Sequence, residues 1–433
     1  MEEAQKIQDK KTNTKLFPIY KMFSWDLLFY YSIIYLFLTQ AKNFSASEVL
    51  LAESFFTASC LFLQIPIGLL VDKFGKKNSL VFANICMCVF ITILLFINNY
   101  KVLLLANFID AIGYVIKGVC ETNILYDSLP KGEKRGTLYS SIDGVGAARY
   151  YVIDAITSII AGITFAIDPY IPVVLCLIVN IIALILSTRF KHTQSQREEE
   201  YSKETARQYF KELREAIKFT FNSKRMLCLM LFFGLMSGLT YNLSTYRSNI
   251  LNSINIPAQY FGVIFAIIQI MAGICSKGQG WLHRRFKNNT LSVLGIPYVA
   301  SCFIIGCLVD SFGECVSNIV VILFILQGAI KGAYNVLIYR YLNNFTNRKI
   351  RVKLATIRNM FFNIISILIS LLGSFLLKVT TSGNTFLIVG GICTVCMVLL
   401  LDYMRGKVGL KPEKYNKEDL KYSSLNEGGN LKW

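Results

Sequence analysis

Three charged side chains share one face of a long apolar segment, residues 102–129. Asp110, Lys117 and Glu121 are seven and four residues apart, and at about 100° per residue they fall on one helical stripe, close to Tyr114. A charged group at the centre of a bilayer costs roughly 2.5–3.5 kcal/mol on insertion scales, so each needs a partner or a water-filled cavity. The two carboxyl groups are candidate proton carriers. Lys117 and Glu121, one turn apart, either belong to a polar site or form an ion pair that only supports helix packing.

Other apolar segments also carry a few polar side chains on one face. Carboxylates suit a cationic group or a proton, lysine and arginine suit a carboxylate or phosphate ester, and tyrosines suit amphipathic or aromatic compounds. Asp154, five residues after Arg149, is a third candidate proton carrier, unless the two residues only pair with neighbouring helices. The candidates for a small-molecule cavity, besides Tyr114 and Lys117, are Asp26, Tyr30, Arg247, Gln327, Lys331 and Tyr334.

The segments that hold these residues are long enough to cross a membrane. Of the 433 residues, 54% are hydrophobic and only 17% are charged. The apolar residues come in blocks of about twenty, the length of a helix that spans ~30 Å of hydrocarbon. This pattern excludes a disordered, fibrous or ordinary soluble protein. We predict an all-α membrane protein with twelve transmembrane helices, at residues 18–40, 46–71, 78–99, 102–129, 138–167, 170–189, 225–253, 258–282, 290–311, 315–343, 352–379 and 383–404.

One long gap and a weak internal repeat divide the twelve helices into two pseudo-symmetric bundles of six. The stretches that begin at Arg135 and Arg351 match in their Arg, Leu, Ser/Thr and Asp/Asn positions, as expected of a duplicated architecture. Apolar residues at helical spacing predict an amphipathic helix between the bundles. The predicted domains are an N-terminal six-helix bundle at 1–189, a cytoplasmic linker at 190–224, a C-terminal six-helix bundle at 225–405 and a cytoplasmic polar tail at 406–433.

The distribution of basic residues predicts the orientation in the membrane. Of the 45 Lys and Arg residues, 35 lie in or next to alternate loops and the two terminal segments. The loops on the other side hold only Lys42, Lys101 and Lys378. Since basic residues accumulate on the cytoplasmic side, we predict that both termini are cytoplasmic and that the protein lies in the cell membrane of a bacterium, as a monomer in the lipid bilayer.

The sequence argues against several classes of function. The net charge of +18 would suggest a nucleic-acid partner for a soluble domain, but here the basic residues sit between apolar blocks. The two histidines, His192 and His283, have no companion at metal-ligand spacing, and no Gly-x-x-x-x-Gly-Lys-Ser/Thr loop is present. We therefore predict no nucleic-acid partner, no metal, no cofactor and no enzymatic activity.

The loop after the second predicted helix contains a recognisable motif. It reads Gly68-Leu-Leu-Val-Asp72-Lys73-Phe-Gly75-Lys76-Lys77-Asn-Ser-Leu80. This resembles the signature G-x-L-a-D-r-x-G-r-k-x-x-l of the major facilitator superfamily, at its expected place. Gly75 suits a tight turn, and the lysines hold the loop in the cytoplasm. The stretches 64–68 and 123–129 also resemble a bacterial branch of that family, so the resemblance covers nearly the whole chain.

The resemblance implies a mechanism and a gate. Members alternate access by rocking two halves around a central cavity lined by helices 1, 4, 7 and 10, which would include the stripe of Asp110. In the family the acidic residue of the motif helps to lock the halves together on the cytoplasmic side in the outward-open state, and by resemblance this residue would be Asp72. Arg351 and Arg358 are its candidate partners. His283 stands where the second half would carry an Asp, so we predict a one-sided lock.

These patterns predict a secondary active transporter that exports an amphipathic or hydrophobic small molecule. The predicted coupling ion is the proton, with a sodium ion as the alternative. The helix at 138–167 lacks the Gly-Pro pair that is common in drug/proton antiporters of the family, so that activity does not follow from the resemblance alone. The alternative is uptake or exchange of an organic anion through Lys117, Lys331 and Arg247. A channel, a sensor and a membrane-embedded enzyme are remote alternatives.

Overall fold

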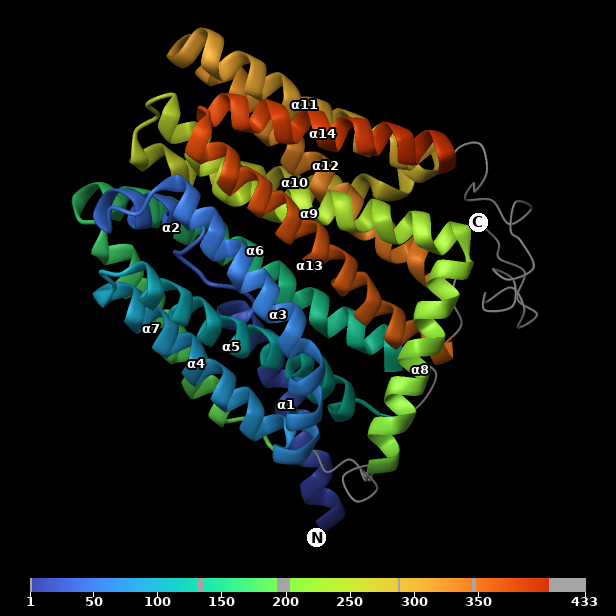
Figure 1. Ribbon diagram of the computed structural model, residues 1–433. Coiled ribbons are helices and arrows are strands. Elements are labelled where there is room, and N and C mark those ends of the chain that lie inside the picture. The colour runs from blue at the N-terminus through green and yellow to red at the C-terminus, as the bar shows by residue number, and fades with distance from the viewer. Residues whose placement is uncertain (1, 131–134, 193–202, 287–288, 345–347, 405–433) are drawn as a thin grey trace. The chain divides into compact units, whose positions relative to one another are not determined.

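The computed structural model describes residues 2–130, 135–192, 203–286, 289–344 and 348–404 (Figure 1). Within these ranges every regular element is a helix, and eleven helices are long and apolar enough to cross a membrane. The predicted all-α membrane fold is confirmed.

Contacts between residues divide the chain into two compact units. The first consists of residues 1–205 and 257–266, and the second of residues 206–256 and 267–433. The domain boundaries that we predicted from the hydropathy of the chain stay a prediction.

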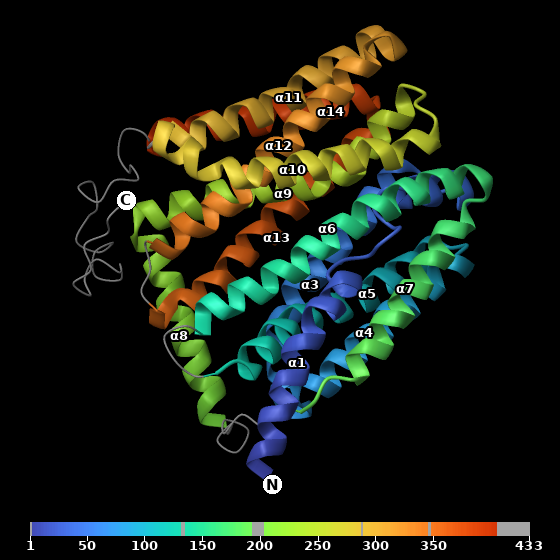
Figure 2. The same ribbon diagram turned by 180° about the vertical axis from the view of Figure 1, so that it is seen from behind.

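In the first unit the long helices pack in neighbouring pairs. α4 packs against both α5 and α7, α5 packs against α3, and α1 packs against α6, as Figures 1 and 2 show. Side chains of α1, α3, α4, α5 and α7 form one apolar core that includes Phe17, Ile67 and Leu125. The elements are α1 (Glu2–Ser24), α2 (Ile34–Leu36), the π-helical turn η1 (Phe37–Ala41), α3 (Ala46–Phe74), α4 (Lys76–Phe96), α5 (Tyr100–Ser128), α6 (Arg135–Ile167) and α7 (Tyr170–Thr188).

The second unit repeats this paired packing. α11 packs against α14 and α9 packs against α13. Small residues allow the close approach, since a Cβ atom on Gly390 of α14 would lie 2.8 Å from the backbone nitrogen of Phe303 on α11. Its elements are α8 (Lys203–Asn222), α9 (Lys224–Ser253), α10 (Ala258–Phe286), α11 (Thr290–Phe312), the 3-10 turn η3 (Gly313–Val316), α12 (Ser317–Asn344), α13 (Arg348–Val379) and α14 (Ser382–Tyr403). The first residues of α8 and α10 belong to the first unit.

Local sequence signals explain where α3 begins and ends. Ser45 and Glu48 form a capping box, in which the Ser45 hydroxyl accepts from the Glu48 N–H at 3.2 Å and the Ser45 N–H donates to the Glu48 carboxylate at 2.8 Å. α3 ends at Phe74, and the next residue, Gly75, has a φ of 82° that is strained for residues with a side chain. The signature loop therefore makes a one-residue turn between α3 and α4.

α8 occupies the segment in which we predicted an amphipathic helix. Leu213, Ala216 and Phe219 are buried on one side, while Lys211 and Lys218 are exposed on the other. This division of apolar and basic residues is typical of a helix that lies along a membrane surface.

The first predicted transmembrane helix, at residues 18–40, is not continuous. α1 ends at Ser24, residues 25–33 are non-helical, and α2 begins at Ile34. Inside this break Phe29 has a φ of 64°, a left-handed conformation that bulky residues rarely adopt. The prediction of one helix over 18–40 is therefore wrong. Side chains form hydrogen bonds with backbone groups of the break, so the chain can leave the helix here. A hydropathy pattern cannot show such hydrogen bonds.

Candidate functional site

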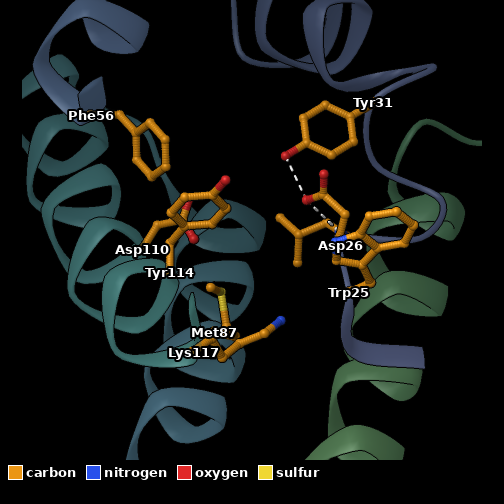
Figure 3. Close-up of a pocket in the computed structure, with 9 residues that line it drawn as sticks. Trp25, Asp26, Tyr31, Phe56, Met87, Asp110, Tyr114 and Lys117 are labelled. Carbon is orange, nitrogen blue, oxygen red and sulfur yellow. Dashed lines mark hydrogen bonds between the residues drawn. The ribbon is translucent and has the colours of Figure 1, made fainter. Parts of the chain in front are cut away.

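A small pocket lies in the first unit, next to the break in the first helix (Figure 3). Its internal volume is about 10 Å³, which is the room of about one water molecule. It collects four of the residues that we predicted for the cavity or for proton coupling. The lining residues are Trp25, Asp26, Leu27, Tyr31, Phe56, Met87, Asp110, Tyr114 and Lys117.

Asp26 organises the non-helical side of the pocket. Its Oδ1 accepts a hydrogen bond from the backbone N–H of Leu27 at 3.0 Å and one from the hydroxyl of Tyr31 at 2.8 Å (Figure 3). The first of these bonds gives a partner to a backbone N–H group of the non-helical break. Both bonds hold the carboxylate at the pocket.

A second carboxylate, Asp110, faces the pocket from α5. It interacts electrostatically with Asp26 and with Glu53 of α3. Tyr30 lies in the same electrostatic neighbourhood, and its ring contacts the rings of Tyr31 and Phe90. Three carboxyl groups from three elements thus lie near one another. A proton or a cationic group bound here would interact with all three.

Lys117 and Glu121 do not form the direct ion pair that we predicted as one of two interpretations. The ammonium of Lys117 donates to the backbone carbonyl of Ser24, the last residue of α1. The hydroxyl of the same serine donates to Glu121 Oε1 at 3.3 Å. Ser24 therefore links the two charged side chains, which also interact electrostatically. Lys117 lines the pocket, and Glu121 lies one turn further along α5.

The last turn of α1 is also anchored by a partly buried ion pair. Lys21 Nζ lies 2.5 Å from Asp143 Oδ1 on α6, and the two side chains are 8% and 30% exposed. The same ammonium stands 4.5 Å from the centre of the Trp25 ring, a cation–π geometry. Tyr20 accepts a hydrogen bond from Asn84 of α4 at 3.0 Å. Polar contacts thus tie the end of α1 to three neighbouring helices.

The remaining candidate on α6 does not line this pocket. Asp154 is buried, whereas Arg149, five residues earlier, is exposed. Asp154 interacts electrostatically with Tyr150 on its own helix. Its role as a proton carrier stays a prediction.

The second unit holds the other predicted cavity residues. Arg247 of α9 is 8% exposed, and its guanidinium lies 5.3 Å from the centre of the Phe324 ring. On α12, Gln327 donates to Ser301 at 2.7 Å, and Tyr334 shares a 2.9 Å hydrogen bond with Ser237. Lys331 lies between Gln327 and Tyr334 on α12 and is half-buried. Gln327 and Tyr334 therefore stabilise packing inside the unit.

The structure describes only part of the predicted gate. Gly68 lies in α3, and Lys76 Nζ forms an ion pair with Asp127 Oδ2 at 2.5 Å, which ties α4 to α5. Lys77 is half-exposed at the start of α4. Arg358 of α13 donates to Asn359 and lies over the Phe233 ring. The side chains of Asp72, Lys73 and Arg351 lie outside the described residues, so the gate stays a prediction.

The sequence interpretation missed several residues of this site. Glu53 could have been found most easily, since it is an acidic residue two turns inside the predicted transmembrane segment 46–71. The pair of Lys21 and Asp143 spans 122 positions in the chain, and no local pattern joins them. The aromatic residues Trp25 and Phe56 lie in apolar stretches of the sequence, and nothing in those stretches indicates a pocket.

A family model described as "Major Facilitator Superfamily" matches residues 16–313 and 298–425 of the chain. The chain belongs to the Major Facilitator Superfamily. This confirms the resemblance that the signature loop indicated. Within the superfamily, the chain is 24% identical over 242 residues to YxaM of Bacillus subtilis (strain 168), described as an uncharacterized MFS-type transporter. The match covers 55% of this chain and 58% of that protein, so the chain spans little more than half the length of this relative.

Solved structures of the superfamily share the fold. A nucleoside transporter, NupG, superposes with a TM-score of 0.68 at 12% identity, covering 93% of this chain and 99% of that one. The inward-open xylose transporter XylE from E. coli has a TM-score of 0.61 at 13% identity, covering 93% and 97%. At these identities the likeness establishes the fold alone.

Proposed function

We propose that this superfamily member is a secondary active transporter that exports an amphipathic or hydrophobic small molecule in exchange for protons. The observation that supports this most is the pocket at the break of the first helix. It combines carboxylates with aromatic walls inside a helical unit of transmembrane length. Alternating access by two halves of the chain is the transport mode that the family implies.

The proton chemistry is assigned to Asp110, with Asp26 and Glu53 as its neighbours. An ionised carboxylate is costly inside a membrane. Neutralising it, by a proton or by a cationic group, lowers the cost of closing the pocket around it. A carboxyl group that is exposed to one side at a time then carries a proton from one side to the other. Glu121 and Asp154 are the further candidates for this role.

The substrate class follows from the remaining walls of the pocket. The rings of Trp25, Tyr31, Phe56 and Tyr114 offer apolar and cation–π surfaces. A compound with an aromatic or aliphatic body and a cationic group fits this combination of rings and carboxylates. In the conformation described here the pocket holds about one water molecule, so substrate binding requires it to open.

Transport of an organic anion is the second candidate. The buried guanidinium of Arg247 in the second unit supports it, because arginine binds carboxylates and phosphates in bidentate geometry. In the first unit the ammonium of Lys117 already donates to Ser24, which leaves this lysine less suited to an anion. The pocket chemistry therefore favours the amphipathic compound.

Purified protein in liposomes tests the proposal. With an acidic interior and an alkaline exterior, wild-type protein is expected to accumulate an amphipathic dye such as ethidium, and to exchange labelled for unlabelled dye without a gradient. Asp110→Asn is expected to lose the gradient-driven accumulation and retain the exchange, because the amide keeps the shape of the side chain and carries no proton.

The matched control is Asp402→Asn, the same substitution at an exposed position near the end of α14. It is expected to behave as wild type. A wild-type protein that exchanges a labelled carboxylate or phosphate ester but no amphipathic compound would favour the second candidate. Accumulation by Asp110→Asn at the wild-type level would exclude Asp110 as the obligatory proton carrier.

A further inference from the structure

The end of α1 creates an unusual demand for hydrogen-bond partners. α1 stops at Ser24, which is 1% exposed, inside the segment 18–40 that we predicted to cross the membrane. The last four carbonyl groups of a helix have no partner inside that helix. Where water is absent, each such group needs a partner from elsewhere in the protein.

Lys117 supplies one of these partners. Its side chain is 6% exposed, and its ammonium donates to the carbonyl of Ser24 from the neighbouring helix α5. The C-terminal end of a helix carries a partial negative charge, which favours a cation at this place. Lys117 thus acts at the end of α1 as a cap that comes from another helix.

A second acceptor for the same ammonium lies one turn away. Glu121 accepts from the Ser24 hydroxyl and interacts electrostatically with Lys117 and Lys21. Lys21 is already in an ion pair with Asp143, so Lys117 is the cation left to respond to the charge of Glu121. The groups around Glu121 are Tyr20 and Lys21 of α1 and Lys117 of α5, with Asn84 of α4 and Asp143 of α6 one contact further away.

The capped end leads directly into the pocket. The three residues after Ser24 are Trp25, Asp26 and Leu27, and all three line the pocket, as does Lys117 itself. Any shift of the end of α1 therefore moves the wall that carries the Asp26 carboxylate.

We propose that Lys117 is a positioning residue that caps the interrupted first helix and thereby holds residues 25–33 in place as the pocket wall. Glu121 competes for the same ammonium. While Glu121 is neutral, Lys117 stays on the Ser24 carbonyl and the break is held. When Glu121 is ionised, it attracts Lys117 away from the carbonyl and the break loosens. The competition by Glu121 rests on the proposed proton coupling, whereas the capping role of Lys117 does not.

Hydrogen–deuterium exchange of the full-length protein in nanodiscs tests this assignment without any substrate. The readout is the exchange rate of amides in residues 25–33, at acid and alkaline pH, corrected for the intrinsic rate. Lys117→Met removes the donor and is expected to accelerate this exchange at least about tenfold, the effect of losing a hydrogen bond from a charged group. Lys117→Gln keeps an N–H donor without the charge and is expected to restore part of the protection.

A matched control is available at the opposite end of the same unit. Lys42 donates to the backbone carbonyl of Leu95, near the end of α4, at 2.8 Å. Lys42→Met removes an equivalent contact and is expected to leave residues 25–33 unchanged. Exchange in α9 to α14 serves as the check that each variant is folded. Unchanged exchange of residues 25–33 in Lys117→Met would overturn the assignment, and so would a Gln variant as unprotected as the Met variant.

Glu121→Gln tests the competition. It is expected to protect residues 25–33 at both pH values, whereas wild type is expected to lose protection at alkaline pH. A wild-type response to pH that persists in Glu121→Gln would overturn the competition. If the hydrogen–deuterium exchange results are as expected but no variant alters proton-driven transport, the proposed coupling fails and the capping role stands. If Asp110→Asn abolishes proton-driven transport while Lys117→Met leaves the hydrogen–deuterium exchange of residues 25–33 unchanged, the capping role fails and the proposed function stands.

Discussion

The two units differ in what fills the polar positions between their helices. In the first unit, ionisable side chains gather around the break in the first helix, where Asp26, Asp110 and Lys117 line one pocket and Lys21 pairs with Asp143. In the described part of the second unit, several contacts between helices are hydrogen bonds between neutral groups. Asn242 of α9 donates to Ser366 of α13 at 2.9 Å and accepts from Ser370, and Gln327 donates to Ser301.

This difference suggests a division of labour. Carboxyl groups and lysines change charge or exchange partners when a proton binds, so the first unit is suited to respond to pH. Neutral hydrogen bonds between helices keep their geometry over the whole physiological pH range and specify which helix faces pack together. We expect proton coupling to depend on the first unit and the polar contacts of the second unit to serve helix packing.

Beyond Asp110→Asn, the largest effect is expected from neutralising Glu121. Glu121→Gln keeps the shape of the side chain but removes the charge that competes for Lys117, so pH-driven accumulation should fall several-fold, next in size to the loss in Asp110→Asn, while gradient-free exchange of the substrate persists. Glu215→Gln, the same substitution on the exposed side of α8, is the control and should transport normally. Intact accumulation in Glu121→Gln would contradict a role of Glu121 in proton coupling and leave Asp110 as the proton carrier.

A large effect on stability is expected at the ion pair that anchors α1. Asp143→Asn leaves the ammonium of Lys21 without its carboxylate. Breaking a fully buried pair costs about 3–5 kcal/mol, and because Asp143 is 30% exposed we expect about 1–3 kcal/mol here. Thermal denaturation in detergent measures this loss. The double variant Lys21→Met/Asp143→Leu should recover most of it, and a double variant less stable than Asp143→Asn would contradict the role of the pair.

A smaller loss is expected from the neutral network of the second unit. Asn242→Leu removes one donor and one acceptor and leaves Ser366 and Ser370 with unsatisfied groups, at a cost of about 1–3 kcal/mol. The pH profile of transport should keep its shape, because no ionisable group changes. A shifted pH profile in Asn242→Leu would contradict the division between the units, even if the variant were as unstable as expected.

The smallest effect is expected at the ion pair between the signature loop and α5. The side chains of Lys76 and Asp127 are 21% and 22% exposed, so solvent screens them, and Lys76→Met should cost less than about 1 kcal/mol. The thermal midpoint should stay close to that of wild type. A loss as large as that of Asp143→Asn would show that the signature loop contributes more to the stability of the unit than its exposure indicates.

Most helices of the fold could be predicted from hydropathy because a transmembrane segment needs a fixed length of apolar residues. The predicted segment 78–99 corresponds to α4 at Lys76–Phe96, and 383–404 corresponds to α14 at Ser382–Tyr403. The break at residues 25–33 could not be predicted, because its apolar composition is that of a helix. The carbonyl of Ser24, the last residue of α1, accepts from a lysine on a different helix, 93 positions away.

The candidate site could be predicted in part. The helical spacing of Asp110, Tyr114 and Lys117 places them on one face, and all three line one pocket. The same spacing suggested a direct pair between Lys117 and Glu121, but periodicity cannot show that Ser24 of another helix stands between them. Partners that come from distant parts of the chain, such as Asp143 for Lys21, require the tertiary structure.

Proton movement coupled to substrate tests the central claim most directly. Liposomes loaded with a pH-sensitive dye report protons that move when an exchanged compound is added without a pre-existing gradient. Wild type and Arg247→Gln are expected to move protons with the compound, whereas Asp110→Asn is expected to exchange the compound with no proton signal. Proton movement that persists in Asp110→Asn and is lost in Arg247→Gln would contradict the assignment of coupling to the first unit.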